Sequence, residues 1–197
     1  MRQAIKQTAV YSLSELSDSA KQTAFQTLAT WATDDSFWYE SLLDDAKEIG
    51  KIIGIDIANI YFSGFSSQGD GACFTGSYDY AKGSCKAIRQ YAPNDTDLHD
   101  IADGLAAIQK PNFYQLSASV EHSGRYSHEY CTAVSVHLDG YPAPAETYDA
   151  VTDLLRDFMR WIYKRLEAEY EYCTSEEMLT ENAEANEYEF TESGEIY

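Results

Sequence analysis

The spacing of apolar residues divides the chain into helical and extended segments. Intervals of three and four residues predict amphipathic helices over residues 37–49 and 148–166. A helix that starts near Ser12 and runs to about Ala32 is also expected, and a shorter helix over 97–109 stops before Pro111. The long helix over residues 148–166 is the most regular. Its apolar face consists of Tyr148, Val151, Leu155, Phe158, Ile162 and Leu166.

Local start and stop signals support these helices. Ser12 and Glu15 match a capping box, in which the hydroxyl accepts from a backbone amide and the carboxylate reaches back to another. A second capping box, Thr174 to Glu177, predicts a final helix to about Ala185, and the last ten residues have no helical period. Gly50 or Gly54 is expected to end the second helix.

Two pairs of segments have the alternation that is typical of strands. Residues 57–65 and 72–80 flank a glycine-rich loop and predict a hairpin, and a turn-rich connection around Pro93 follows it. Residues 113–121 and 126–138 form a second pair, joined at residues 122–125. Their alternation of apolar and polar side chains indicates an antiparallel sheet that is buried on one face.

The expected fold is therefore α+β. It contains an antiparallel sheet of about four strands, an N-terminal helical pair and a long C-terminal amphipathic helix. With 197 residues, 44% of them hydrophobic, the chain is long enough for a substantial core. We expect a single α+β domain over residues 1–173, followed by an acidic, helical or extended extension over residues 174–197.

Charge changes this picture most at the C-terminus. The chain has a net charge of −19, and residues 166–197 contain eleven glutamates and no lysine or arginine. Aromatic residues are interleaved with these glutamates. A single-sign, aromatic-rich segment of this kind is suited to binding a basic protein surface.

The same composition disfavours several function classes. So acidic a chain is unsuited to direct binding of nucleic acid or of anionic membranes, because phosphate contacts require lysine or arginine. No stretch approaches the length of a membrane-spanning helix. The four cysteines, which are Cys73, Cys85, Cys131 and Cys173, are dispersed and predict reduced thiols in the core. We expect no metal, no cofactor and no catalytic residue.

Four segments resemble a family of small acidic proteins of tailed bacteriophages and prophages, often labelled antitoxins of toxin-antitoxin stability systems. They are Tyr11–Lys21, Ile60–Phe74 with its Ser-Gly-Phe-Ser-Ser-Gln-Gly-Asp-Gly-Ala core, Gly124–Tyr130 and the Glu-Tyr-rich end Leu166–Phe190. The resemblance covers nearly the whole chain. It implies a cytoplasmic location in a bacterial host cell and an antitoxin or anti-defence role, but it assigns no site residue.

The loop from Ser66 to Gly71 is the first candidate site. It consists of Ser66, Ser67, Gln68, Gly69, Asp70 and Gly71. The two glycines permit positive φ and close backbone approach, which favours a small-anion cradle. Asp70, however, stands where an anion would bind, and Gly-Asp-Gly between two strands is also the pattern of a hairpin turn.

His122 and His128 form a second candidate, able in principle to act as acid and base. Strand parity places both rings on the core side of the sheet, whereas Glu129 would point away from it. A buried, hydrogen-bonded histidine is therefore the alternative. A Cys-His nucleophile pair with Cys131 or Cys73 requires the two hairpins to be adjacent.

The third candidate is the acidic C-terminal surface, together with Asp34, Asp35, Asp44, Asp45 and Glu48. Its predicted partner-binding residues are Glu167, Glu169, Tyr170, Glu171, Tyr172, Glu176, Glu177, Glu181, Glu184, Glu187, Tyr188 and Glu189. In an extended chain, alternate glutamates would repeat near 7 Å, close to the phosphate spacing of DNA. In a helix they would fan out. A solvated, frayed terminus is the alternative.

The favoured hypothesis is a non-enzymatic phage or prophage protein that inhibits a host toxin or a nucleic-acid-directed defence protein. Its acidic surface would occupy a basic site on that partner and could imitate nucleic acid. The enzymatic alternative is a small hydrolase or nucleotide-binding enzyme that uses the Gly69–Gly71 loop with His122 or His128. A minor structural component of a phage particle is a third possibility.

Overall fold

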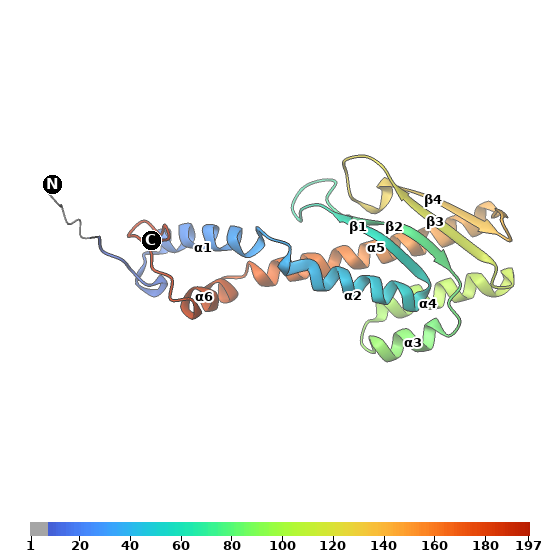
Figure 1. Cartoon of the computed structure of the whole chain (residues 1–197), viewed down its shortest axis with the longest axis horizontal. Coiled ribbons are helices and arrows are strands. Elements are labelled where there is room, and N and C mark those ends of the chain that lie inside the picture. Colours follow the sequence, from blue (N-terminus) through green and yellow to red (C-terminus); the bar gives the residue numbers. More distant parts are fainter. Residues whose placement is uncertain (1–7) are drawn as a thin grey trace, which may run out of the picture. The chain divides into compact units, whose positions relative to one another are not determined.

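The computed structural model describes residues 8–197 and confirms the α+β class. Its described residues form six α-helices, three short 3₁₀ turns and one five-stranded antiparallel sheet (Figure 1). They group into two compact units. Unit 1 contains residues 8–40 with Ala168–Tyr197, and unit 2 contains Ser41–Glu167.

Unit 2 contains the whole sheet, whose strands lie in the order β1-β2-β3-β4-β5. The strands are β1 (Ile55–Phe62), β2 (Ala72–Asp79), β3 (Leu116–His122), β4 (Thr132–Leu138) and β5 (Tyr141–Pro142). Four were expected. The two-residue β5 was not predicted, because a proline such as Pro142 usually marks the end of a sheet. Here Pro142 pairs with His137 on the edge strand, where the missing N–H of proline is tolerated.

One face of the sheet is buried against helices, as the alternation predicts. Leu116, Ala118 and Val120 are buried on β3, while the intervening serines are partly exposed. The helices of unit 2 are α3 (Ser84–Tyr91), α4 (Thr96–Gln109) and the unit 2 parts of α2 (Phe37–Ile53) and α5 (Ala145–Cys173). The Phe158 ring of α5 meets the Phe74 ring of β2 edge-on, with centroids 6.1 Å apart.

A buried glutamine joins α4 to the sheet. The Gln109 side chain is fully buried, and its amide group donates to the Leu116 carbonyl at 2.7 Å and accepts from the Leu116 N–H at 3.1 Å. Its Nε2 also lies 3.2 Å from the Tyr78 hydroxyl. The N–H and carbonyl of Leu116 are therefore hydrogen-bonded to a side chain, while the start of β3 pairs with β4 through Leu138.

One helix was not predicted, and one strand begins well after its predicted start. The residues of α3 were expected to belong to a turn-rich connection. They form a helix that starts after Gly83, which has the αL conformation. Arg89 on this helix pairs with Asp103 of α4 at 2.6 Å. Strand β4 begins at Thr132 rather than near Tyr126, because residues 129–131 form a 3₁₀ turn.

Unit 1 is helical. It contains the 3₁₀ turn η1 (Leu13–Glu15), α1 (Asp18–Thr33), the start of α2, the end of α5 and α6 (Glu176–Ala185). The predicted capping box at Ser12 is present, but it starts η1, and Ser17 caps α1. Helix α6 is capped by Ser175 rather than Thr174. Helix α2 ends at Ile53, directly before Gly54, which has a φ of +92°.

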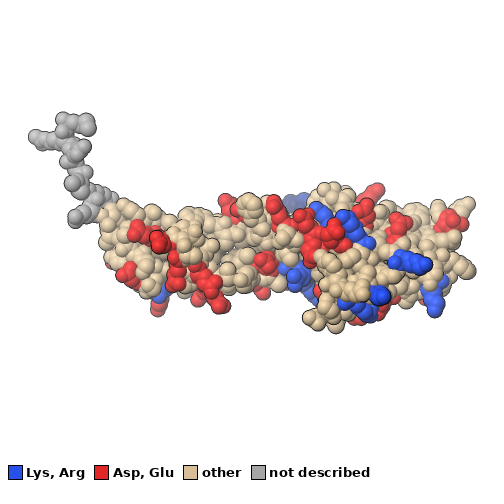
Figure 2. Space-filling model, turned by 60° about the horizontal axis from the view of Figure 1, so that its bottom comes forward, with Lys and Arg blue, Asp and Glu red and all other residues tan. Residues whose placement is uncertain are grey.

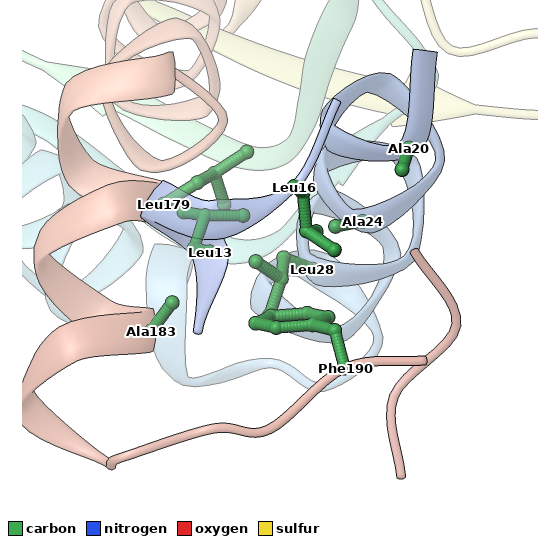
Figure 3. Packing of buried hydrophobic residues seen from close by; sticks show 8 residues of the cluster. All are labelled: Leu13, Leu16, Ala20, Ala24, Leu28, Leu179, Ala183 and Phe190. Atoms are coloured by element: carbon green, nitrogen blue, oxygen red, sulfur yellow. The ribbon is translucent and has the colours of Figure 1, made fainter. Parts of the chain in front are cut away.

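The core of unit 1 holds the chain's C-terminal segment in place (Figure 3). Its buried members are Leu13, Leu16, Ala20, Ala24, Leu28, Leu179, Ala183 and Phe190. Phe190 is 0% exposed, and its backbone exchanges two hydrogen bonds with Tyr11, at 2.8 and 2.9 Å. Gly194, with a φ of +88°, lies so close to the Ala20 carbonyl that a Cβ would be 2.0 Å from its oxygen.

This division differs from the predicted one, which placed residues 174–197 outside a domain spanning 1–173. The C-terminal segment packs with the first helices, and residues 41–167 form a separate unit. The prediction rested on composition, and a pairing between Tyr11 and Phe190 leaves no local pattern in the sequence. No helix within residues 8–197 has both the length and the apolar character needed to cross a membrane.

Candidate functional site: an acidic surface on unit 1

The predicted partner-binding residues fall almost entirely in unit 1, on the end of α5, on α6 and on the segment after it. Glu171, Glu176, Glu177, Glu181, Glu184, Glu187 and Glu189 are exposed. Glu169 is half-buried, and Glu167, also half-buried, belongs to unit 2. Glu167, Glu169 and Glu171 lie within α5, so they fan around a helix and do not form the extended ladder near 7 Å.

Unit 1 carries a large excess of carboxylates. Residues 8–40 and 168–197 contain fifteen acidic side chains and one basic side chain, Lys21, whereas residues 41–167 contain eighteen acidic and eleven basic ones. On the face shown in Figure 2, basic side chains gather over unit 2, while unit 1 shows mainly acidic ones. The excess charge thus belongs to a folded unit.

The carboxylates of unit 1 have no cationic partners among the residues that the structure describes. Every ion pair in the described chain lies in unit 2. Where unit 1 carboxylates accept hydrogen bonds, the donors are neutral. The Ser12 amide and then the Ser12 hydroxyl lower the pKa of Glu15, which therefore stays ionised at neutral pH.

The aromatic residues of the acidic segment have mixed roles. The Tyr170 ring meets Trp38 edge-on at 5.8 Å, and the Tyr188 ring meets Trp31 edge-on at 6.0 Å. Both tyrosines are half-buried, so much of their surface packs within unit 1. Tyr172 is 57% exposed and can reach a partner.

The acidic residues near the start of the chain separate into two groups. Asp34 and Asp35 are exposed in unit 1, close in sequence to the end of α1. Asp44, Asp45 and Glu48 lie on α2 within unit 2, where all three are engaged. Lys47 approaches Asp44 at 3.5 Å, Lys51 approaches Glu48 at 2.7 Å, and the Tyr91 hydroxyl donates to Asp45 at 2.5 Å.

The loop from Ser66 to Gly71 in unit 2 uses its own carboxylate as the acceptor. The Ser66 and Ser67 amides donate to one Asp70 oxygen at 3.0 and 2.6 Å. Asp70 therefore occupies the two amides that would hold an anion. Ser66, Ser67 and Gln68 are exposed. Gly71 is buried, and any larger residue in its place would put its Cβ only 2.6 Å from the His128 Cβ.

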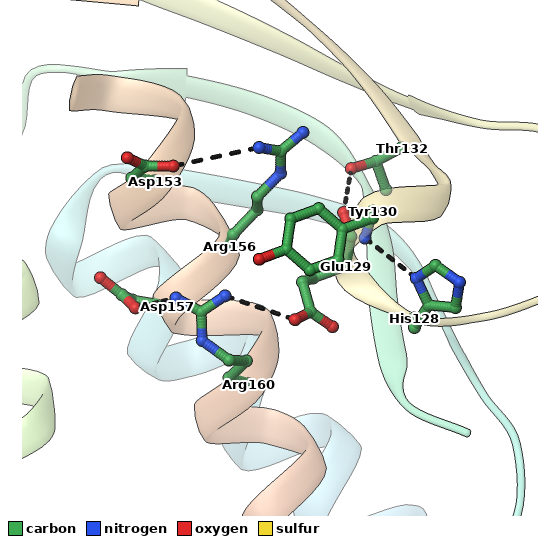
Figure 4. Close-up of polar contacts among 8 residues, drawn as sticks. All are labelled: His128, Glu129, Tyr130, Thr132, Asp153, Arg156, Asp157 and Arg160. Carbon is green, nitrogen blue, oxygen red and sulfur yellow. Dashed lines mark hydrogen bonds and ion pairs between the residues drawn. The ribbon is translucent and has the colours of Figure 1, made fainter. Parts of the chain in front are cut away.

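His122 and His128 are half-buried near this loop rather than in the core. His122 is the last residue of β3, whereas His128 precedes a 3₁₀ turn and is not on a strand. The His122 Nε2 bonds the Tyr126 carbonyl at 2.8 Å. His128 caps a 3₁₀ turn, and its Nδ1 accepts from the Tyr130 amide at 3.2 Å (Figure 4). A neutral His128 with that acceptor carries its proton on Nε2.

The structure brings Cys131 to His128, with 3.2 Å between the Cys131 Sγ and the His128 Nε2. In the tautomer just described, His128 donates to the sulfur, so it cannot also accept the thiol proton as a general base. Cys73 is 0% exposed, and burial raises the pKa of its thiol to about 12. All four cysteines are free, but only Cys73 is in the core.

A charged network that the sequence did not predict holds the turn at residues 129–131 against α5 (Figure 4). Arg160 pairs with Glu129 at 3.4 Å and with Asp157 on its own helix. The Arg156 guanidinium lies over the Tyr130 ring, 4.9 Å from its centroid. Arg156, Arg160 and Lys164 of α5 thus pair within unit 2, and no basic residue follows Arg165 on the acidic end of the helix.

A cavity of about 600 Å³ in unit 2 has carboxylates in its wall, but each already has a protein partner. Tyr91 donates to Asp45, the Trp161 Nε1 donates to Asp95 at 2.8 Å, and Lys164 pairs with Asp97 at 3.1 Å. Within residues 8–197, no three histidine, cysteine or acidic side chains are grouped so that they could bind a metal ion.

Comparisons with known proteins place the chain in a family without a described activity. No curated protein and no solved structure matches it. Residues 38–176 match the model of a domain of unknown function, DUF8835. This match includes all of unit 2 but only residues 38–40 and 168–176 of unit 1. Because the matched region covers more than half of the chain, the protein belongs to the DUF8835 family.

Proposed function

We propose that this protein is a non-enzymatic interaction protein that binds a basic surface on another protein through the carboxylates of unit 1. One observation carries the proposal: unit 1 combines fifteen acidic side chains with a single described basic one, and no ion pair neutralises them among the described residues. Such a surface steers a basic partner into contact and rejects anionic ones.

The folded state of the segment supports binding rather than simple solubilisation. Leu179 and Ala183 pack α6 into the core of unit 1, and Phe190 packs the chain beyond it. The backbone that carries the exposed glutamates between these residues is therefore ordered. Preorganised charges lose less conformational entropy on binding than charges on a flexible tail.

The proposed partner class is a host toxin or a nucleic-acid-directed defence protein, which rests on the resemblance to phage and prophage proteins. Glu177, Glu181 and Glu184 follow one face of α6 at intervals of four and three residues. Their helical rise is about 6 and 4.5 Å, which is shorter than a DNA phosphate repeat. Imitation of nucleic acid would therefore act through charge density rather than through a matched ladder of anions.

The enzymatic alternative has less support from the geometry. Asp70 fills the amide cradle of the loop, and His128 donates to Cys131 rather than accepting from it. A hydrolase working here would lose its activity in the double variant Asp70→Ala, His128→Ala. An interaction protein acting through unit 1 would keep its cellular effect in that variant.

Affinity capture from a bacterial host lysate tests the proposal with two matched baits. In one bait, Glu177, Glu181, Glu184 and Glu187 of unit 1 are changed to glutamine. In the other, the same number of exposed carboxylates in unit 2 are neutralised, at Asp56, Asp79, Glu121 and Glu146. Neutralising charges is preferable to deleting residues after Cys173, because deletion also removes Leu179 and Phe190 from the core.

The expected result is one basic protein that the wild-type and unit 2 baits retain and the unit 1 bait loses. Its retention should fall steeply as ionic strength rises from low to physiological, because exposed charges are screened. Equal retention by all three baits, or retention insensitive to salt, would show that unit 1 carboxylates are not the binding surface.

A further inference from the structure

An apolar cleft opens within unit 1, between α1 and α6. Its wall consists of Leu28, Trp31, Ala32, Cys173, Met178, Leu179, Asn182 and Tyr188. Trp31 is 50% exposed even though its ring packs edge-on against Tyr188. A large aromatic ring with half its surface in solvent, beside further apolar side chains, is typical of the anchor sites of protein interfaces.

The size and polarity of the cleft favour a side chain as the occupant. Its volume of about 280 Å³ lies below the range of roughly 300–1,000 Å³ that is usual for cofactors and other small ligands. Asn182 is the one side-chain amide in its wall, and that amide already accepts from Asn186 at 3.1 Å. Burial of an apolar side chain would thus be the main source of affinity.

Charge around the cleft indicates what carries that side chain. Exposed carboxylates adjoin the wall residues in sequence: Asp34 follows the Trp31 end of α1, Glu177 and Glu181 stand next to Met178 and Asn182, and others flank Tyr188. A second copy of this chain would bring another acidic unit 1 and be repelled, as would an anionic lipid surface. A segment with lysine or arginine on either side of its apolar residue is complementary.

We infer that this cleft receives an apolar side chain from a basic segment of the partner protein, while the surrounding glutamates bind the flanking cations. The inference rests on the proposed function and adds a point of specificity to it. The carboxylates would govern the association rate and its salt dependence, and the cleft would govern the dissociation rate and the choice of residue.

Three synthetic peptides of about twelve residues serve as probes. The first has several lysines around a central leucine, the second has alanine in place of that leucine, and the third keeps the leucine but replaces lysine with serine. Titration calorimetry gives their affinities, and NMR of the indole N–H signals locates the binding. We expect the first peptide to bind about tenfold more tightly than the second, from the larger apolar area buried. It should shift the Trp31 signal.

Variants separate the cleft from the charge around it. Trp31→Ala should remove the preference for leucine over alanine and leave salt-sensitive binding of both lysine peptides. Phe37→Ala is the matched control, because Phe37 is an aromatic residue of unit 1 that is 79% exposed and lies outside the cleft. Asn182→Phe, which fills the cleft from an exposed position, should have the same effect as Trp31→Ala without removing a packed side chain.

The outcomes separate the inference about the cleft from the proposed function on which it rests. Equal affinity of the wild-type protein for the leucine and alanine peptides would contradict binding of the leucine side chain in the cleft. A preference for leucine that survives Asn182→Phe would contradict it as well. Either result leaves charge-driven binding in place. Failure of both lysine peptides to bind at low salt overturns both. Tight binding of the serine peptide would show that the cleft selects apolar segments without regard to their charge, which also contradicts the inference.

Discussion

Unit 2 pairs many of its charges internally, whereas no ion pair lies in the described part of unit 1. In unit 2, Arg89 bonds Asp103, Arg160 joins Glu129 and Asp157, and Lys164 meets Asp97. In unit 1 a single described cation, Lys21, faces fifteen carboxylates. Repulsion among like charges destabilises a compact state, so the uncompensated carboxylates of unit 1 should lower its stability rather than raise it.

The two cores differ as well. In unit 2, the Phe74 ring of β2 meets the Phe158 ring of α5, which stacks on the Trp161 ring. The core of unit 1 includes three alanines and one phenylalanine among its eight buried members. The smaller core buries less apolar surface, so we expect unit 1 to be the less stable of the two, and a basic partner that binds only its folded form to stabilise it.

The family match follows the same division. DUF8835 residues 38–176 include all of unit 2 but leave most of unit 1 outside. The proposed binding surface therefore lies mainly outside the region that defines the family. A function shared across that family would be expected in unit 2, and partner choice in unit 1.

The largest expected effect is on the core of unit 1. Phe190→Ala should destabilise unit 1 by about 4 kcal/mol, because it removes a fully buried ring and leaves a cavity. Urea unfolding followed by separate NMR signals from each unit measures the change. Tyr197→Ala, at a 68% exposed position in the same segment, should change stability by less than about 0.5 kcal/mol. Equal effects of the two variants would mean that the segment is not packed.

The corresponding test in unit 2 removes buried hydrogen bonds. Gln109→Ala should destabilise unit 2 by about 3 kcal/mol, because it leaves the buried N–H and carbonyl of Leu116 without partners. The same unfolding experiment applies, with exposed Gln115→Ala as the control. A loss below about 1 kcal/mol would show that the Gln109 hydrogen bonds are not needed to hold β3.

A smaller effect is expected on thiol reactivity, which can be compared for one cysteine from each unit. Burial, followed by the nearby Glu169 carboxylate, raises the pKa of Cys173, and burial raises that of Cys73 to about 12. Since the thiolate is the reactive form, alkylation of Cys173 should rise only at a higher pH than for a free thiol. Removing the negative charge with Glu169→Gln should lower that pKa and speed alkylation at pH 8, while Cys73 stays unmodified.

Mass spectrometry of alkylated peptides gives both rates. Glu171→Gln is the control, because Glu171 is exposed and has no part in the pKa shift of Cys173. Unchanged alkylation in Glu169→Gln would show that the 3.7 Å contact from Cys173 to Glu169 does not control the thiol.

Sequence patterning predicted the elements whose signals are local. The three-and-four spacing predicted α2 and α5, capping boxes predicted α1 and α6, the stop at Pro111 marked the end of α4, and strand patterns predicted β1 to β4. It missed α3, which starts after an αL glycine in a segment rich in turn residues, and it missed β5. The 3₁₀ turn at residues 129–131 interrupts the alternation expected of β4, and strand parity therefore misplaced His128. His122 is on a strand, but it is the last residue of β3 and is only half-buried.

The candidate site was predictable only as a stretch of charge. Glutamates clustered in the sequence identify the segment, but Phe190 resembles any other aromatic residue there until it is paired with Tyr11 near the start of the chain. The apolar cleft had no signal at all, because Trp31 and Tyr188 belong to distant segments that meet only in the fold.

Hydrogen exchange of the free protein tests most directly whether the acidic C-terminal segment is a folded surface. We predict that the amides of Leu179, Ala183 and Phe190 are protected at least about 100-fold relative to an unfolded chain, because they lie in α6 or bond Tyr11. Exchange throughout residues 174–197 at the rate of an unfolded peptide, with the sheet of unit 2 still protected, would contradict it.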